Sequence, residues 1–189
     1  MIILIGLPKS GTSSFQYLFT LLGYNSYHWR KNNKYIGTMI KNNKINNKPL
    51  LNDFLDNDAI TQMDVCIDKT NCYWPQITDY KQIHKENPDS IFILNKRNPK
   101  DLLDSFKRWG KLHKRIFTYN PELIADKTDE GFKKFVNKFY KDVEKYFTSD
   151  SNIKFISYDI NNDNIEKLKK YIDIKHYKRF PKKNVNPTK

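Results

Sequence analysis

The chain has little of several features that would place it in a specialised class. It holds only two cysteines, Cys66 and Cys72, and neither belongs to a set of Cys and His residues at zinc-ligand spacing. No run of about 18 apolar residues and no signal-like segment comes before the apolar stretch that starts at Ile2. We therefore expect reduced thiols, no structural metal, no membrane span and a cytoplasmic location.

Acidic residues are also scarce. The chain carries 21 Asp and Glu residues against 34 Lys and Arg residues, which gives a formal net charge of +13. Such a surface attracts phosphate, sulfate or nucleic acid. The abundance of Lys, Asn and Ile also matches what A/T-rich codons encode, so charge alone predicts no nucleic-acid partner. Hydrophobic residues make up 38% of the 189 residues, which is enough for one core, and we expect a single domain over residues 1–189.

Apolar runs alternate with helical periodicity along the chain. Strands are expected at Ile2–Ile5, Tyr24–Trp29, Ser90–Leu94 and Ile153–Tyr158, with a weaker one at Asp64–Ile67. Helices are expected at Thr12–Leu22, from Pro75 to about Lys85, and at Pro99–Trp109, Phe132–Phe147 and Ile165–Ile172, with one or two short ones in Lys31–Leu55. This alternation predicts an α/β fold, a three-layer α/β/α arrangement around a mainly parallel central sheet. Ligands bind such sheets at the carboxyl ends of the strands.

The most specific motif is the turn between the first strand and the first helix, with the sequence GLPKSGTSS. Gly6 and Gly11 have the spacing of a phosphate-binding loop, whose backbone N–H groups and helix N-terminus bind phosphate or sulfate. Thr12 stands where a nucleotide triphosphatase needs its lysine, which disfavours ATP hydrolysis with magnesium. Lys9 lies inside the turn instead. There it could stabilise charge that builds on a bridging oxygen of the bound anion.

A second anion anchor follows the strand at Ser90–Leu94. Arg97 comes directly after this strand, and Ser105 lies about two helical turns further on, so both can face the crevice at the strand ends. A planar arginine fork beside a hydroxyl suits a phosphate monoester.

These motifs resemble those of the sulfotransferases that use 3′-phosphoadenosine-5′-phosphosulfate (PAPS), in a compact, single-domain branch with a P-loop-like phosphosulfate-binding loop. The family's loop reads PKSGTT or PRTGTS, and its second motif, R-x-P-x-x-x-x-x-S, matches Arg97, Pro99 and Ser105. Further segments follow the branch in order: LLGY, YHW, ENPDSIFIL, ISYDI and FPKKNVN. The similarity extends nearly from end to end.

The resemblance implies transfer of a sulfuryl group from PAPS to a hydroxyl or amine, without a metal and with adenosine 3′,5′-bisphosphate as product. Arg97 and Ser105 would hold the 3′-phosphate, and Lys9 would stabilise the leaving group. The 5′-phosphosulfate would be held by Pro8, Lys9, Ser10, Gly11, Thr12, Ser13 and Ser14. The last residues, 176–189, form a basic tail that we expect to close over the nucleotide through Lys182, Lys183 and Asn184, although a solvated terminus explains the composition equally well.

Two residues are candidates for the base that takes the acceptor's proton. Asp68 follows the weak strand at Asp64–Ile67 and corresponds to an aspartate that faces the acceptor pocket in the similar branch, although it could simply pair with Lys69. His28 titrates near neutrality, and its YHW setting resembles the branch's YHM. The sequence leaves this choice open.

The acceptor itself has no motif. We expect a small molecule or glycan, no membrane partner and no nucleic acid, with a pocket built from Lys31–Leu55 and Lys111–Asp129. The oligomeric state is left open. Two alternative functions are a P-loop kinase of small molecules, which the missing lysine after Gly11 disfavours, and a non-catalytic binder of anionic polymers, which only the net charge suggests.

Overall fold

A seven-stranded sheet forms the centre of the protein. The computed structural model describes residues 1–110 and 112–183, and the strands of this sheet lie in the order β4-β3-β2-β5-β1-β8-β9. The neighbours from β2 to β9 run parallel, while β3 and β4 add an antiparallel edge. The central strand β1 therefore has β5 on one side and β8 on the other. The chain crosses over β1 between them, which opens a crevice at its carboxyl end.

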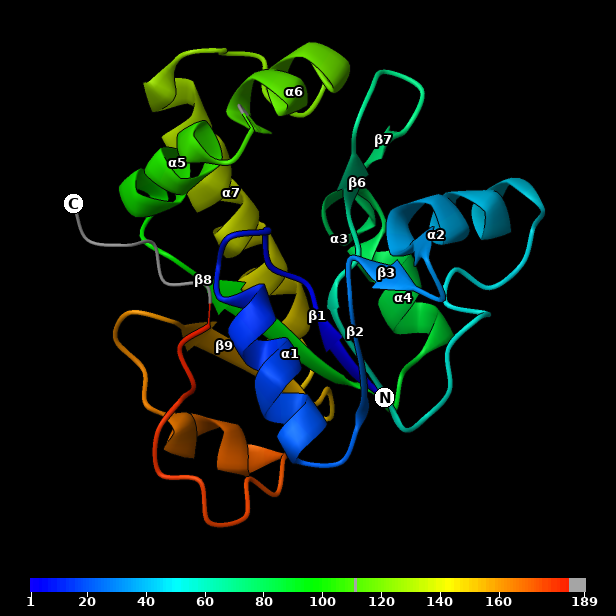
Figure 1. The fold of residues 1–189 in the computed structure, drawn as a ribbon, viewed down its shortest axis with the longest axis vertical. Helices are drawn as coiled ribbons and strands as arrows, with labels where there is room; N and C mark the ends of the chain where they lie inside the picture. The colour runs from blue at the N-terminus through cyan, green and yellow to red at the C-terminus, as the bar shows by residue number, and fades with distance from the viewer. Residues whose placement is uncertain (111, 184–189) are drawn as a thin grey trace.

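Helices cover both faces of the sheet (Figure 1), which confirms the expected three-layer α/β/α fold. The strands are β1 (Ile2–Leu4), β2 (Asn25–His28), β3 (Arg30–Lys31), β4 (Lys34–Tyr35), β5 (Asp58–Gln62), β6 (Val65–Cys66), β7 (Cys72–Tyr73), β8 (Ile91–Lys96) and β9 (Phe155–Asp159). The helices are α1 (Thr12–Leu21), α2 (Ile36–Ile45), α3 (Pro75–Thr78), α4 (Tyr80–Glu86), α5 (Pro99–Arg108), α6 (Leu112–Tyr119), α7 (Asp129–Phe147) and the 3-10 helix η1 (Ile165–Lys170).

The alternation of side chains along β1 divides the core in two. Ile2 and Leu4 pack with the apolar faces of α1 and η1, whereas Ile3 and Ile5 pack with those of α2, α4, α5 and α7. All four side chains are almost completely buried. Because both faces of β1 are covered, this strand reads as an uninterrupted apolar run in the sequence. The loop that follows it is thereby held at the middle of the sheet edge.

The structure corrects the expected secondary structure at several places, and it adds α6 (Leu112–Tyr119), where the sequence analysis expects no helix. The strand beside β1 is β5, Asp58–Gln62, and it ends before the expected strand at Asp64–Ile67, of which only Val65–Cys66 is a strand. The helix expected from Pro75 to about Lys85 is two helices, α3 and α4, separated at Asp79. The last helix is a 3-10 helix. The sequence DAITQ does not predict β5, because its apolar and polar residues do not alternate clearly and it includes an acidic residue, Asp58. In the structure Asp58 is buried, with its Oδ2 3.1 Å from Lys31 Nζ.

Strands β6 and β7 form a separate antiparallel hairpin that stands beside α6 (Figure 1). A disulfide joins Cys66 to Cys72 across it, so the expectation of reduced thiols is wrong. The six-residue separation of the two cysteines in the sequence does not predict the bond, because only the hairpin brings them opposite each other. Among the described residues, no helix has the length and apolar character needed to cross a membrane.

Candidate active site

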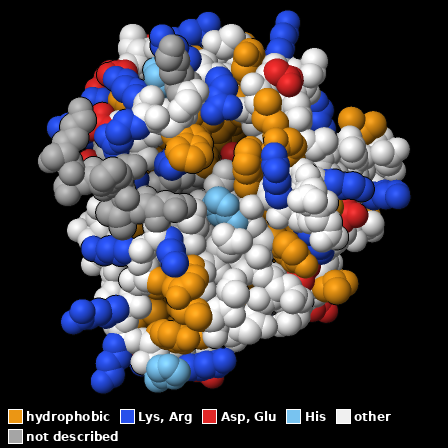
Figure 2. All heavy atoms as spheres, viewed as in Figure 1, with side chains coloured by type: hydrophobic (Ala, Val, Ile, Leu, Met, Phe, Trp, Pro, Cys, Tyr) orange, Lys and Arg blue, Asp and Glu red, His pale blue; other side chains and the backbone are white. Residues whose placement is uncertain are grey.

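A large cavity opens where the carboxyl ends of the parallel strands meet. Its volume is about 860 Å³, within the usual range of small-molecule sites. Residues that follow β1, β5, β8 and β9 line it, together with α6 and the C-terminal segment up to Lys183. Lys and Arg side chains are common on this face of the molecule and acidic ones are few (Figure 2). The cavity therefore favours an anionic ligand.

The loop between β1 and α1 forms one wall of the cavity. Lys9 and Gly11 both have left-handed backbone angles, with φ of 67° and 79°. A left-handed non-glycine residue is uncommon, and such strained residues cluster at functional sites. The first backbone bonds of α1 run from the N–H groups of Ser14 and Phe15 to the carbonyl of Gly11. The N–H groups before them lie at a helix N-terminus, which is suited to an anion.

Asn95, in β8, fixes the shape of this loop. The N–H of Gly6 donates to Asn95 Oδ1 at 3.0 Å, and Asn95 Nδ2 donates to the carbonyl of Ser10 at 2.9 Å. A Cβ atom at Gly6 would lie 2.3 Å from Asn95, so no other residue fits at this position. Ser10 is completely buried, and it contributes through its main chain. Sequence analysis missed Asn95, although an amide at the end of the apolar strand SIFIL was a visible signal.

The two expected anion anchors adjoin each other. Arg97 Nη1 donates to the carbonyl of Lys9 at 2.8 Å, and both side chains line the cavity together with Ser105. Burial lowers the pKa of Lys9, and the charges of Arg97 and Arg108 lower it further. Lys9 Nζ lies 4.0 Å from the ring centre of Trp109. The loop and the guanidinium group thus form one continuous cationic surface.

A hydrogen-bonded chain of side chains connects α1 to β2 and β5. Thr12 Oγ1 lies 3.0 Å from His28 Nε2 and donates to Gln62 Oε1 at 3.2 Å. Burial lowers the pKa of His28 to about 4, and the charge of Lys9 contributes to the shift. His28 is therefore neutral at neutral pH. The tautomer of the neutral imidazole sets which of His28 Nε2 and Thr12 Oγ1 is the donor.

Two carboxylates line this cavity, Asp64 and Asp163, and Asp64 is the buried one. Asp64 comes shortly after β5, is 4% exposed, and accepts hydrogen bonds from Gln76 Nε2 at 3.0 Å and Gln62 Nε2 at 3.3 Å. Burial raises its pKa to about 7, although these two hydrogen bonds and the charge of Arg115 work in the opposite direction. Sequence analysis did not single out Asp64 because β5 was not recognised. Buried, titrating near neutrality and facing a cavity, it has the properties of a functional carboxylate.

Asp68 is not with these residues. It is exposed in the turn of the β6–β7 hairpin, where its Oδ1 accepts hydrogen bonds from the N–H groups of Thr70 and Asn71, both at 2.9 Å, and from the Thr70 hydroxyl. These bonds, the Thr70 hydroxyl first, lower its pKa. The expected placement of Asp68 at the strand ends depended on a strand at Asp64–Ile67. The neighbouring strand of the sheet, β5, ends at Gln62, so the strand end lies before Asp64 and not before Asp68.

The C-terminal segment lies against the loop. The N–H of Lys183 donates to Ser14 Oγ at 2.9 Å, and Phe180 packs on Phe15 and Tyr158 with ring centres 4.7 and 5.2 Å apart. Lys182 and Lys183 both line the cavity. Asn184, the third expected tail residue, lies outside the described residues.

The remaining expected residues are distributed as follows. The cavity is lined by Pro8, Gly11, Thr12, Ser13, Ser14, Arg97 and Ser105, as well as by His28. Among the described residues, no three His, Cys, Asp or Glu side chains gather in a group that could hold a metal ion.

Comparison with known proteins agrees with this geometry. A family model described as a sulfotransferase domain matches residues 1–180 of the chain. No curated protein matches the chain. A match over nearly the whole length, on a chain whose glycine-containing loop and Arg97 meet in one cavity, shows that the protein belongs to the sulfotransferase domain family.

Proposed function

We propose that the protein transfers a sulfuryl group from PAPS to a hydroxyl or amine of its acceptor. The observation that carries the proposal is the contact of Arg97 with the carbonyl of Lys9, which joins the two anion anchors in one cavity. A donor with a phosphosulfate at one end and a phosphate on the ribose needs two such anchors close together.

The side chains present suit such a donor. Arg97 Nε is buried and has no hydrogen-bond partner among the described residues, so a bound phosphate oxygen would satisfy it. Ser105, 2% exposed, supplies a hydroxyl at the same wall. The loop main chain and the N-terminus of α1 would hold the phosphosulfate, and Gly11 leaves that helix end uncapped by any side chain.

Residues of the chain can take the proton from the acceptor and stabilise the negative charge on the leaving group. When bound, PAPS supplies the sulfuryl group and leaves as adenosine 3′,5′-bisphosphate. Asp64 takes the proton from the acceptor's hydroxyl or amine as the new bond to sulfur forms, and its pKa of about 7 suits a base at neutral pH. Lys9 stabilises the negative charge that develops on the oxygen released from sulfur. His28, neutral, holds Thr12 in place.

Thermal unfolding with added nucleotides tests the donor. We expect saturating adenosine 3′,5′-bisphosphate to raise the melting temperature by several degrees, because a ligand at about 100 times its Kd adds about 2.7 kcal/mol. Arg97→Ala should lose most of this shift. Stabilisation by ATP with magnesium, and none by adenosine 3′,5′-bisphosphate, would instead favour a kinase. Binding of heparin alone would favour a binder of anionic polymers.

A further inference from the structure

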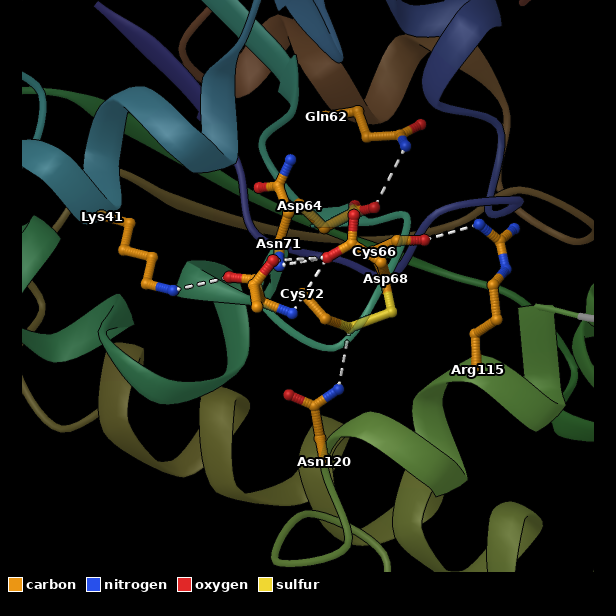
Figure 3. The surroundings of a disulfide bond; sticks show 10 residues. Lys41, Gln62, Asp64, Cys66, Asp68, Asn71, Cys72, Arg115 and Asn120 are labelled. Carbon is orange, nitrogen blue, oxygen red and sulfur yellow. Dashed lines mark hydrogen bonds between the residues drawn. A yellow bond between two sulfur atoms is a disulfide. The ribbon is translucent and has the colours of Figure 1, made fainter.

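The cavity has a second end that the donor anchors do not occupy. The loop, Arg97 and the C-terminal segment form one end, while the β6–β7 hairpin and α6 form the other. Asp64, Cys66 and Arg115 meet at this second end (Figure 3). Because Asp64 is the proposed base, the acceptor's reacting group has to lie beside it.

Arg115 extends from α6 across this end of the cavity. Its Nη1 donates to the carbonyl of Cys66 at 2.5 Å, as Figure 3 shows. Its Nε is buried and has no hydrogen-bond partner among the described residues. Among the described residues, no carboxylate oxygen lies within 4.0 Å of a nitrogen of Arg115, so Arg115 forms no ion pair there.

This arrangement leaves a guanidinium group held in place but not neutralised. Burying a donor without a partner destabilises the protein, and more so when the donor is charged. The charge of Arg115 acts on Asp64, whereas the charges that act on Lys9 come from Arg97 and Arg108. The charge of Arg115 therefore acts at the end of the cavity that contains Asp64, the proposed base.

Apolar and aromatic side chains line the cavity together with the polar Gln62, which bonds to Asp64. Trp29, Trp109 and Leu112 line the cavity, and Trp109, whose ring centre lies 4.0 Å from Lys9 Nζ, is 60% exposed. Flat apolar walls suit the body of a ring-containing molecule, since indole faces pack on aromatic rings and on the C–H faces of sugars. A guanidinium fork suits an oxyanion, because it donates two parallel hydrogen bonds.

We propose that Arg115 binds an oxyanion of the acceptor, so that the substrate is a ring-containing hydroxyl or amine compound that also carries a carboxylate, sulfate or phosphate group. This inference rests on the proposed function and names the substrate class of the same site. The oxyanion group on Arg115 orients the acceptor, and the neighbouring hydroxyl or amine then faces Asp64.

Binding of matched acidic and neutral compounds tests the proposal without any turnover. Calorimetry would compare para-hydroxyphenylacetate with its amide, and methyl glucuronide with methyl glucoside, each with and without adenosine 3′,5′-bisphosphate. We expect at least one acid to bind about tenfold more tightly than its neutral counterpart, as expected of a charge-assisted hydrogen bond. The aromatic and sugar pairs distinguish the two kinds of ring.

Variants of α6 assign the preference to one side chain. Arg115→Gln should remove the preference for the acid, Arg115→Lys should keep part of it, and Lys114→Gln, an exposed neighbour on the same helix, should keep all of it. Equal affinities within both pairs would overturn the proposal. So would a preference that survives Arg115→Gln, even if that variant melts at a lower temperature, because Arg115 would then only hold the hairpin.

The same titrations separate this proposal from the donor assignment. Adenosine 3′,5′-bisphosphate should bind Arg115→Gln as tightly as the wild-type protein, because its anchors lie at the other end of the cavity. If the nucleotide binds neither protein, the donor assignment fails. If it binds both and no acid is preferred, only the acceptor proposal fails.

Discussion

Lys9 and Arg97 touch each other, and the proposed function gives them different tasks. Arg97 holds the loop through the Lys9 carbonyl and offers its buried Nε to a ligand, whereas the Lys9 ammonium group lies in the cavity over Trp109. Loss of a residue that binds the ground state weakens ligand affinity, whereas loss of a group that stabilises developing charge lowers kcat.

Substitution of the two residues should separate these tasks. We expect Lys9→Ala to lower kcat by about 100-fold or more with a small effect on nucleotide affinity. Arg97→Ala should weaken binding of adenosine 3′,5′-bisphosphate by about 10- to 100-fold. Steady-state kinetics and calorimetry measure the two effects, with Lys100→Ala as an exposed control on α5. Equal activity of both variants with the wild type would contradict both assignments.

Asp64 is expected to control the pH dependence of the rate. Burial raises its pKa to about 7, so the carboxylate form, which acts as base, accumulates as the pH rises through 7. The rate should therefore increase with pH and level off above this value. Asp64→Asn should lower kcat by about 100-fold or more and remove this inflection.

Two further variants serve as controls for Asp64. Asp68→Asn should leave the rate and its pH profile unchanged, because the side chain is exposed in the hairpin turn. His28→Gln should keep the inflection near pH 7, since the pKa of His28 lies at about 4. If the inflection disappears in His28→Gln and persists in Asp64→Asn, the histidine is the base.

At the scale of elements, β8 holds the loop between β1 and α1 through Asn95. Its two hydrogen bonds to the loop cross between segments that lie more than 80 residues apart in the sequence. Asn95→Leu should destabilise the protein by about 2–4 kcal/mol, because it leaves the N–H of Gly6 and the carbonyl of Ser10 buried without partners. Urea unfolding measures the loss, with Asn152→Leu, an exposed residue, as the control. Unchanged stability would show that the loop holds its shape alone.

The β6–β7 hairpin is likewise held by a contact between its strands, the disulfide between Cys66 and Cys72. The bond between Cys66 and Cys72 closes a short segment, and the hairpin meets α6 through the contact of Arg115 with the Cys66 carbonyl. The double variant Cys66→Ser, Cys72→Ser should lose about 2 kcal/mol of stability in unfolding experiments. Mass spectrometry after alkylation without a reductant should find both thiols protected. Alkylation of both would show that the bond does not form in solution.

At the scale of the whole molecule, the segment around Phe180 meets the first turn of α1 at the cavity. Phe180 packs on Phe15 of α1, and Lys183 bonds to Ser14. We expect Phe180→Ala to release this segment and to increase the dissociation rate of adenosine 3′,5′-bisphosphate by about fivefold or more, since it removes two aromatic contacts worth about 0.5–1.5 kcal/mol each. Stopped-flow measurements give the rate. An unchanged rate would mean that the segment does not cover the nucleotide.

The sequence by itself determined the layers of the fold and predicted the loop and the arginine that line one end of the cavity. Each of these features is local: the apolar run of β1, the glycines and Lys9 of the loop, and Arg97 directly after β8. A strand followed by a turn and a helix fixes the position of its own loop, so no distant partner is needed to predict it.

Only the tertiary structure decided the other end of the cavity, around Asp64 and Arg115. β5 carries too little apolar character to be recognised, and without it the position of Asp64 could not be inferred. Asn95, the disulfide and Arg115 depend on segments that meet only after folding, through β8 and the loop, the hairpin strands, and α6 and the hairpin. The physical reason is that burial and partners give these polar groups their properties, and both come from packing between distant parts of the chain.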